Sequence, residues 1–152
     1  MKTIVDARRI YQDSAIRGAT PIELVIALYD SAIQDMRGAL SAMKRSDVEA
    51  RGSGISHALM ILQQLQGTLD FERGGNAARQ FEQFYNLVRA KLLEAQMRGS
   101  PDLMQQQIRY MSEVRDCWSQ AKRLLQPRPG SAGESLASTP AGAGDKGSEW
   151  SA

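Results

Sequence analysis

Few side chains in this sequence have the type and spacing needed for metal or cofactor chemistry. The 152 residues include one histidine, His57, and one cysteine, Cys117. A carboxylate-bridged di-iron site in a helical bundle needs a Glu-x-x-His pair from each of two helices, and no Glu stands three residues before His57. A closed zinc site needs four His or Cys ligands. We therefore expect no metal and no cofactor, with His57 partly buried or on the surface.

Catalytic groups are equally sparse. Cys117 has no histidine in its own motif to activate the thiol, so packing in the core or at its flank beside Trp118 is expected. The Gly74-Gly75 pair lacks the Lys-Ser/Thr of a phosphate-binding loop and indicates a turn. Asp30 is expected on a solvated helix face. These residues predict no catalytic site, and hence a binding protein rather than an enzyme.

Composition narrows the class further. The formal net charge is only +2, and basic residues alternate with acidic ones, so no basic stripe for nucleic acid is present. The first ten residues contain no apolar signal segment. The longest uncharged apolar run, residues 24–29, is far shorter than the roughly 20 residues of a membrane span. With a single cysteine and no possible internal disulfide, the sequence predicts a cytoplasmic protein without a membrane span.

Helix-start signals open the first two helices. Thr20-Pro21-Ile22-Glu23 combines a cap, a first-position proline and a capping-box glutamate, which predicts a helix over residues 21–44. Its apolar positions repeat at heptad spacing: Ile22, Val25, Tyr29, Met36 and Met43. A second capping box, Ser46 to Glu49, predicts a helix to about residue 69, with a start at Ser53 as an alternative because Gly52 and Gly54 weaken the first turns.

Two further helices follow. Gly74-Gly75 predicts a break, after which Asn76 caps a third helix that ends at Gly99. Ser100 and Pro101 predict the start of a fourth helix at once. Such short connections make neighbouring helices antiparallel. The expected fold is all-α: an antiparallel four-helix bundle over residues 1–126, with a short N-terminal cap segment.

The last part of the chain has a different composition. Residues 127–152 are rich in Gly, Ser, Ala and Pro, and only Leu136 and Trp150 are large and apolar. Such a segment cannot bury enough surface to offset the entropy of ordering it. We predict a disordered, low-complexity tail.

A surplus of apolar residues marks a candidate partner-binding site. Ile26, Ile33 and Leu40 widen the stripe of the first helix beyond what one bundle seam needs. Ile10 and Tyr11 precede that helix in a segment without a helix of its own. These five residues are predicted to form a groove with a removable cover. The alternative, that all five are simply core, stays open.

Four segments in order resemble the FliS family of flagellar export chaperones. Residues 19–33 (ATPIELVIALYDSAI) resemble its first-helix signature, in which S/T-P-x-x-L leads to L-Y/F-D-x-A. Residues 65–75 (LQGTLDFERGG) resemble the end of its second helix and its Gly-Gly turn, and residues 81–88 (FEQFYNLV) its aromatic third helix. Residues 92–102 together with 114–118 (VRDCW) are similar to the remainder.

The resemblance implies a function. Members are four-helix bundles that bind the C-terminal region of flagellin, which is disordered in the monomer, prevent its premature polymerisation and aid its export through the flagellar secretion system. A tyrosine matched by Tyr11 lies over the empty groove, which the flagellin helices would fill. An export-gate protein and other flagellar regulators are further implied partners. The alternative is an export chaperone or regulatory adaptor for another helical secreted substrate.

Overall fold

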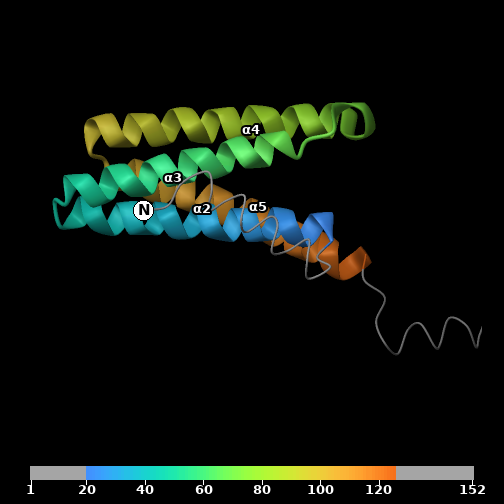
Figure 1. The fold of residues 1–152 in the computed structure, drawn as a ribbon, viewed down its shortest axis with the longest axis horizontal. Coiled ribbons are helices and arrows are strands. Elements are labelled where there is room, and N and C mark those ends of the chain that lie inside the picture. The colour runs from blue at the N-terminus through green and yellow to red at the C-terminus, as the bar shows by residue number, and fades with distance from the viewer. Residues whose placement is uncertain (1–19, 126–152) are drawn as a thin grey trace, which may run out of the picture. The chain divides into compact units, whose positions relative to one another are not determined.

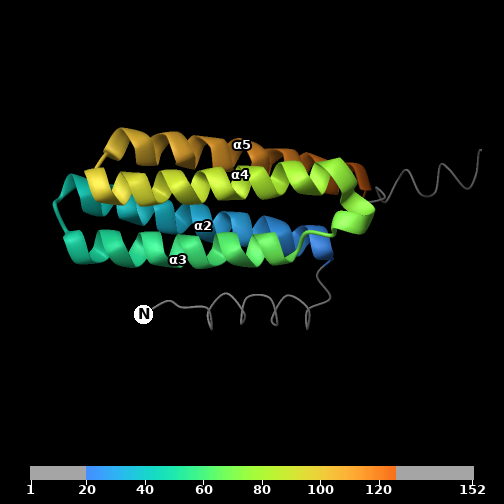
Figure 2. The same cartoon turned by 90° about the horizontal axis from the view of Figure 1, so that it is seen from above.

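Four α-helices make up the fold of the computed structural model, which describes residues 20–125 (Figure 1). The helices are α2 (Pro21–Lys44), α3 (Val48–Gly67), α4 (Phe71–Arg98) and α5 (Pro101–Leu125). Connections at residues 45–47, 68–70 and 99–100 are too short for anything but a reversal of direction, so consecutive helices are antiparallel (Figure 2). The predicted all-α, antiparallel four-helix bundle is confirmed. The cap segment, the tail and the domain limit at residue 126 lie outside the described residues.

The start of α2 is the predicted capping box. The backbone N–H of Glu23 donates to Thr20 Oγ1 at 3.3 Å, and the backbone N–H of Thr20 donates to Glu23 Oε1 at 2.9 Å. Pro21 occupies the first helical position, where its missing N–H leaves no bond unmade. The helix ends at Lys44, as predicted.

The start of α3 differs from the prediction by one residue. Ser46 has φ +58°, a left-handed conformation that closes the turn and cannot serve as the extended cap of a helix. Asp47 caps instead, and its Oδ1 accepts from the backbone N–H of Ala50 at 3.1 Å. The predicted Ser46 capping box is therefore wrong. The later start at Ser53 is wrong too, since the helix is continuous from Val48.

The break at the glycine pair is confirmed, but the helix begins earlier than predicted. Asp70 Oδ1 accepts from the backbone N–H groups of both Glu72 and Arg73 at 3.1 Å, which starts one helical turn before the glycines. Gly75 then departs from helical geometry with φ 52° and ψ −124°. The result is a kink inside α4, and Asp70 rather than Asn76 is the cap of this helix.

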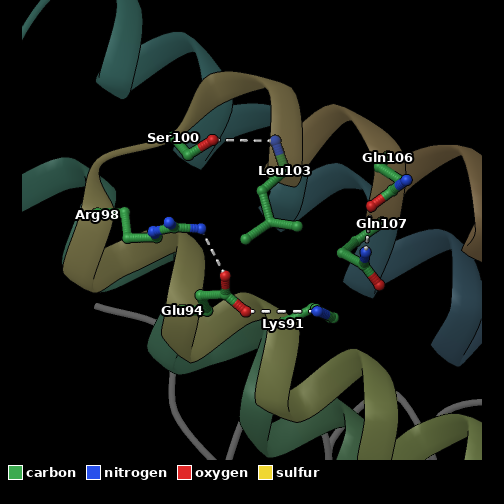
Figure 3. Close-up of polar contacts among 7 residues, drawn as sticks. All are labelled: Lys91, Glu94, Arg98, Ser100, Leu103, Gln106 and Gln107. Atoms are coloured by element: carbon green, nitrogen blue, oxygen red, sulfur yellow. Dashed lines mark hydrogen bonds and ion pairs between the residues drawn. The ribbon is translucent and has the colours of Figure 1, made fainter.

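The turn between α4 and α5 follows the sequence signals closely. Gly99 ends α4 in the left-handed conformation with φ 60°. Ser100 Oγ accepts from the backbone N–H of Leu103 at 3.2 Å and so caps α5 (Figure 3). On the outer face of α4 the same view shows Glu94 between Lys91 and Arg98, at 3.4 and 2.8 Å. Both predicted boundaries are confirmed.

A continuous apolar core fills the bundle. From α2, Tyr29 and Met36 of the predicted heptad pattern are fully buried, and its other members, Ile22, Val25 and Met43, are half-buried. The other helices contribute core residues of the same kind: Ile55, Ile61, Leu62, Leu65, Tyr85, Val88, Leu92, Met104, Ile108 and Met111. Each large aliphatic side chain buried in this way contributes about 1.5–3 kcal/mol of transfer free energy. Gln107 of α5 is buried as well, and its Nε2 donates to Gln106 Oε1 at 3.5 Å (Figure 3).

Candidate partner-binding surface

The predicted groove residues on α2 lie at the edge of the core. Ile26, Ile33 and Leu40 are 8%, 6% and 9% exposed, whereas the neighbouring seam residue Met36 is 0% exposed. Ile33 and Leu40 also belong to the continuous core. Ile10 lies outside the described residues, as does Tyr11, so the proposed cover over this edge stays a prediction.

An aromatic cluster joins three helices at one end of the bundle. The rings of Phe81 on α4 and Trp118 on α5 stack with centroids 5.2 Å apart. Tyr85, one turn after Phe81, packs against it at 6.1 Å. The hydroxyl of Tyr29 on α2 donates to Tyr85 Oη at 2.8 Å in the buried interior. The cluster therefore links α2, α4 and α5 to each other.

The buried tyrosine pair is held in its neutral form. Burial raises the pKa of Tyr29, and its hydrogen bond to Tyr85 opposes this only in part. Burial also raises the pKa of Tyr85, and the adjacent Tyr29 raises it further. Both hydroxyls therefore stay protonated near neutral pH, which suits structural donors and acceptors rather than a general base.

An apolar recess of about 370 Å³ opens beside this cluster. Its wall includes Val25 of α2, Leu69 of the α3–α4 connection, and Phe81 and Trp118 of the aromatic cluster. The kink at Gly75 turns the first part of α4 and contributes to this wall. Such a recess suits one large apolar side chain of a partner.

A second recess, of about 420 Å³, lies between α3 and α4. Three apolar residues line it: Leu59 and Met60 of α3, and Leu93 of α4. Its polar lining consists of Gln63, Gln66 and Arg89. We call this recess the α3–α4 groove.

A buried polar pair crosses between α2 and α3. His57 Nδ1 contacts Asp35 Oδ2, and both residues are buried, so His57 lies deeper than the sequence analysis expected. Gly54 permits the close approach, because a Cβ there would lie 2.9 Å from the carbonyl oxygen of Asp35. Among residues 20–125, no three His, Cys, Asp or Glu side chains gather as a metal site would require.

Two other polar residues have clear positions. Asp30 is exposed, as expected, and accepts from Arg115 Nε on α5 at 2.7 Å and from Arg115 Nη2 at 3.3 Å. The expectation that Cys117 packs in the core or its flank is wrong, because the residue is exposed on α5.

The sequence analysis missed both recesses. Phe81 lies in the segment that resembles the aromatic third helix of the family, and in the structure it also lines the recess of about 370 Å³. A sequence feature that could have indicated the α3–α4 groove is the run of apolar and amide residues after Gly54. It contains more apolar residues than one core-facing stripe of a helix needs. Taken together, the described surface offers recesses for apolar side chains from a partner helix.

The amino-acid sequence of the chain is similar to that of known proteins. The family described as "Flagellar protein FliS" matches residues 4–124. The chain is 28% identical to the flagellar secretion chaperone FliS of Salmonella typhimurium, over 71% of this chain and 81% of the relative. It is 25% identical to the chaperone of the same name from Vibrio cholerae, over 74% and 83% of the two chains.

For a third relative, the matched region covers a larger share of the relative's length. The flagellar secretion chaperone FliSB of Pseudomonas aeruginosa is 26% identical over 78% of this chain and 94% of that protein. In the part of the chain that the structure describes, no helix has the combined length and apolar content of a bilayer span. The family match includes every helix of the bundle, and the chain belongs to the FliS family of flagellar secretion chaperones.

Proposed function

We propose that this chain is a cytoplasmic chaperone for flagellin. It would bind the disordered C-terminal region of the newly made monomer, prevent premature polymerisation and aid export through the flagellar secretion system. The observation that carries this proposal is the family match over residues 4–124, together with relatives named as flagellar secretion chaperones. The role is one of binding and release, without a catalysed reaction.

The surface of the bundle supports a helical, apolar cargo. Two recesses of about 370 and 420 Å³ have apolar residues in their walls; the larger is lined by helices alone, and the smaller also by the α3–α4 connection. An amphipathic segment docks by inserting side chains spaced three or four residues apart into such recesses. Folding on binding costs part of the interaction energy, which suits a cargo that must be released for export.

We also propose that the edge of α2 takes part in cargo binding. Ile26, Ile33 and Leu40 stand seven residues apart along the helix, so they form one line. Ile10 and Tyr11 would cover this line in the empty chaperone and give way to the flagellin helices. The low exposure of the three α2 residues is equally what core residues have, so function and fold must be measured separately.

The test of the main proposal is calorimetric titration of the full chain with monomeric flagellin and with flagellin lacking its C-terminal region. We expect binding to the complete monomer, loss of binding to the truncated one, and slower filament growth when the chaperone is in excess. Equal affinity for both forms, or no effect on assembly, would contradict the proposal. Binding of a different secreted helical protein, with none to flagellin, would favour the alternative chaperone or adaptor role.

The α2 edge is tested with Ile26→Ser, because Ile26 is buried yet lies apart from the continuous core. Leu87→Ser is the matched control, since Leu87 is exposed and lines neither recess. We expect Ile26→Ser to keep its circular dichroism spectrum and lose flagellin affinity, while the control keeps both. A folded Ile26→Ser variant that binds as tightly as the wild type would remove the α2 edge from the cargo site.

A further inference from the structure

The wall of the α3–α4 groove that belongs to α3 is free of ionic charge. Residues 52–67 contain no Asp, Glu, Lys or Arg, although 24% of the whole chain is of these types. The exposed positions of this stretch include Ser53, Ser56 and Gln63. A stretch of sixteen uncharged residues within one helix is unusual in a chain of ordinary charge content, because exposed helix faces normally carry charged side chains.

The floor of the groove is apolar and accessible. Leu59 and Met60 of α3 face Leu93 of α4 across a recess of about 420 Å³. Leu93 is 43% exposed, and Met97, one turn later on α4, is 87% exposed. Flexible Met and Leu side chains adapt to the shape of a partner. This surface has the apolar area for docking, and no charged residue of α3 flanks it over this stretch.

The rim at the other end is a network of amides around one arginine. Gln66 Nε2 donates to Asn86 Oδ1 at 2.8 Å, which links α3 to α4. Arg89 Nη1 donates to the same Asn86 oxygen at 3.0 Å, and Arg89 Nη2 donates to Gln66 Oε1. No carboxylate among residues 20–125 lies within ion-pair distance of Arg89, so its positive charge is held only by neutral oxygens.

The uncharged wall and the single Arg89 together favour one kind of binding partner for the groove. A charged side chain pressed against residues 52–67 would lose its hydration without an opposite charge to pair with, whereas an amide or hydroxyl can bond to Gln or Ser. Beside Arg89 alone, a carboxylate would be favoured. Helix α4 of a second copy is a poor match, because its exposed face carries Lys91, Glu94 and Arg98 beside its apolar positions.

We propose that the α3–α4 groove is a cargo seat for an amphipathic helix whose apolar stripe is bordered by uncharged Ser, Thr, Asn, Gln or Ala residues, with an acidic residue only where the helix meets Arg89. The proposal rests on the proposed function in taking the occupant to be a helix of the exported protein. It adds a chemical rule for which cargo segment binds here: low charge beside the stripe, and not apolar content alone.

The first experiment uses two synthetic helical peptides with the same apolar stripe. One has Ser, Asn and Gln beside the stripe, and the other has alternating Lys and Glu with the same net charge. Each peptide has about fourteen residues, or about 21 Å of helix, which is longer than the segment of α3 from Leu59 to Gln66 that lines the groove. We expect the uncharged-border peptide to bind the full chain at least about tenfold more tightly in calorimetry. Equal affinities, or tighter binding of the Lys/Glu peptide, would overturn the rule.

Variants locate the site. Leu93→Glu should weaken binding of the uncharged-border peptide by about tenfold or more, because it replaces an apolar lining residue of the groove with a charged side chain that a docked helix would desolvate. Leu87→Glu is the matched control, a similarly exposed leucine on the same helix that does not line the groove. Should Leu93→Glu fail to fold by circular dichroism, Met60→Glu takes its place, since Met60 also lines the groove and is only half-buried. Unchanged binding in the folded variant overturns the proposal.

Titration of the same variants with monomeric flagellin separates this proposal from the proposed function. Flagellin binding that is unaffected by Leu93→Glu would remove the groove from the cargo site and leave the chaperone role intact. Peptide binding at the groove without any flagellin binding would instead contradict the flagellin role and keep the groove. Self-association of the wild-type chain that Leu93→Glu abolishes would overturn the proposal in favour of a second copy.

Discussion

Single residues in the core of α2 carry measurable stability. Met36 of α2 is fully buried and belongs to the continuous apolar core of the bundle. Replacing it with alanine removes three heavy atoms from a packed interior, so Met36→Ala should lower the free energy of unfolding by about 2–5 kcal/mol. Urea denaturation measures this. Met97→Ala is the control, and because Met97 is exposed its effect should stay within about 0.5 kcal/mol. Similar small losses in both variants would contradict the packing described for Met36.

The buried tyrosines predict how stability depends on pH. Folding raises the pKa of both Tyr29 and Tyr85, chiefly by burial. In the unfolded chain they lose their protons near pH 10, the ordinary value, while the folded chain keeps them. The unfolded state is therefore favoured as pH rises, and the free energy of unfolding should fall above about pH 10. The double variant Tyr29→Phe, Tyr85→Phe should show a shallower fall in urea titrations, and identical slopes would contradict this account.

At this scale the sequence predicted burial better than pairing. The heptad spacing of Tyr29 and Met36 indicated the buried stripe, because a helix places such residues on one face by geometry alone. The contact of Asp35 with His57 was not predictable, since it depends on how α2 and α3 are rotated against each other. The role proposed for Ile26 in cargo binding could not be predicted from the sequence for a similar reason, because an apolar position on a helix can face either the core or a partner.

Helix packing in this bundle depends on a glycine at one crossing point. At Gly54 a Cβ would lie 2.9 Å from the Asp35 carbonyl oxygen and 3.2 Å from Ala39 Cβ. Gly54→Ala must push α3 away from α2 and strain the Asp35–His57 contact, so a loss of about 1–3 kcal/mol is expected. Gly38→Ala, in open space on α2, should instead stabilise by about 0.4–1 kcal/mol. Differential scanning calorimetry compares them, and a stable Gly54→Ala protein would refute the close approach.

Element boundaries were predictable wherever one side chain alone could cap a helix. Thr20 and Ser100 both accept the expected backbone N–H groups. At the start of α3, Ser46 and Asp47 are both good caps, and the choice is made by the left-handed conformation of Ser46. Asp70 was not predicted as a cap because the glycine pair that begins four residues later indicated a break, and the start of the helix was placed after that break.

At the scale of the whole molecule, the composition of residues 127–152 differs from that of the rest of the chain. We predict that deleting residues 127–152 leaves helicity and melting temperature almost unchanged, because this segment has too few large apolar residues to dock. Circular dichroism melts of the truncated and complete chains provide the measurement. A clear fall in melting temperature on truncation would indicate that Leu136 or Trp150 packs on the bundle. The antiparallel arrangement itself was predictable, because the connections leave no other path.

The brevity of those connections also bears on how quickly the protein reaches its fold. Contacts across α2 and α3, or across α3 and α4, join helices that follow each other directly in the chain, because only residues 45–47 and 68–70 separate them. Helical proteins with such local contacts fold in microseconds to milliseconds. Chain synthesis proceeds at about 5–20 residues per second, so folding would keep pace with translation. A chaperone built this way would be ready to bind almost as soon as the ribosome releases it.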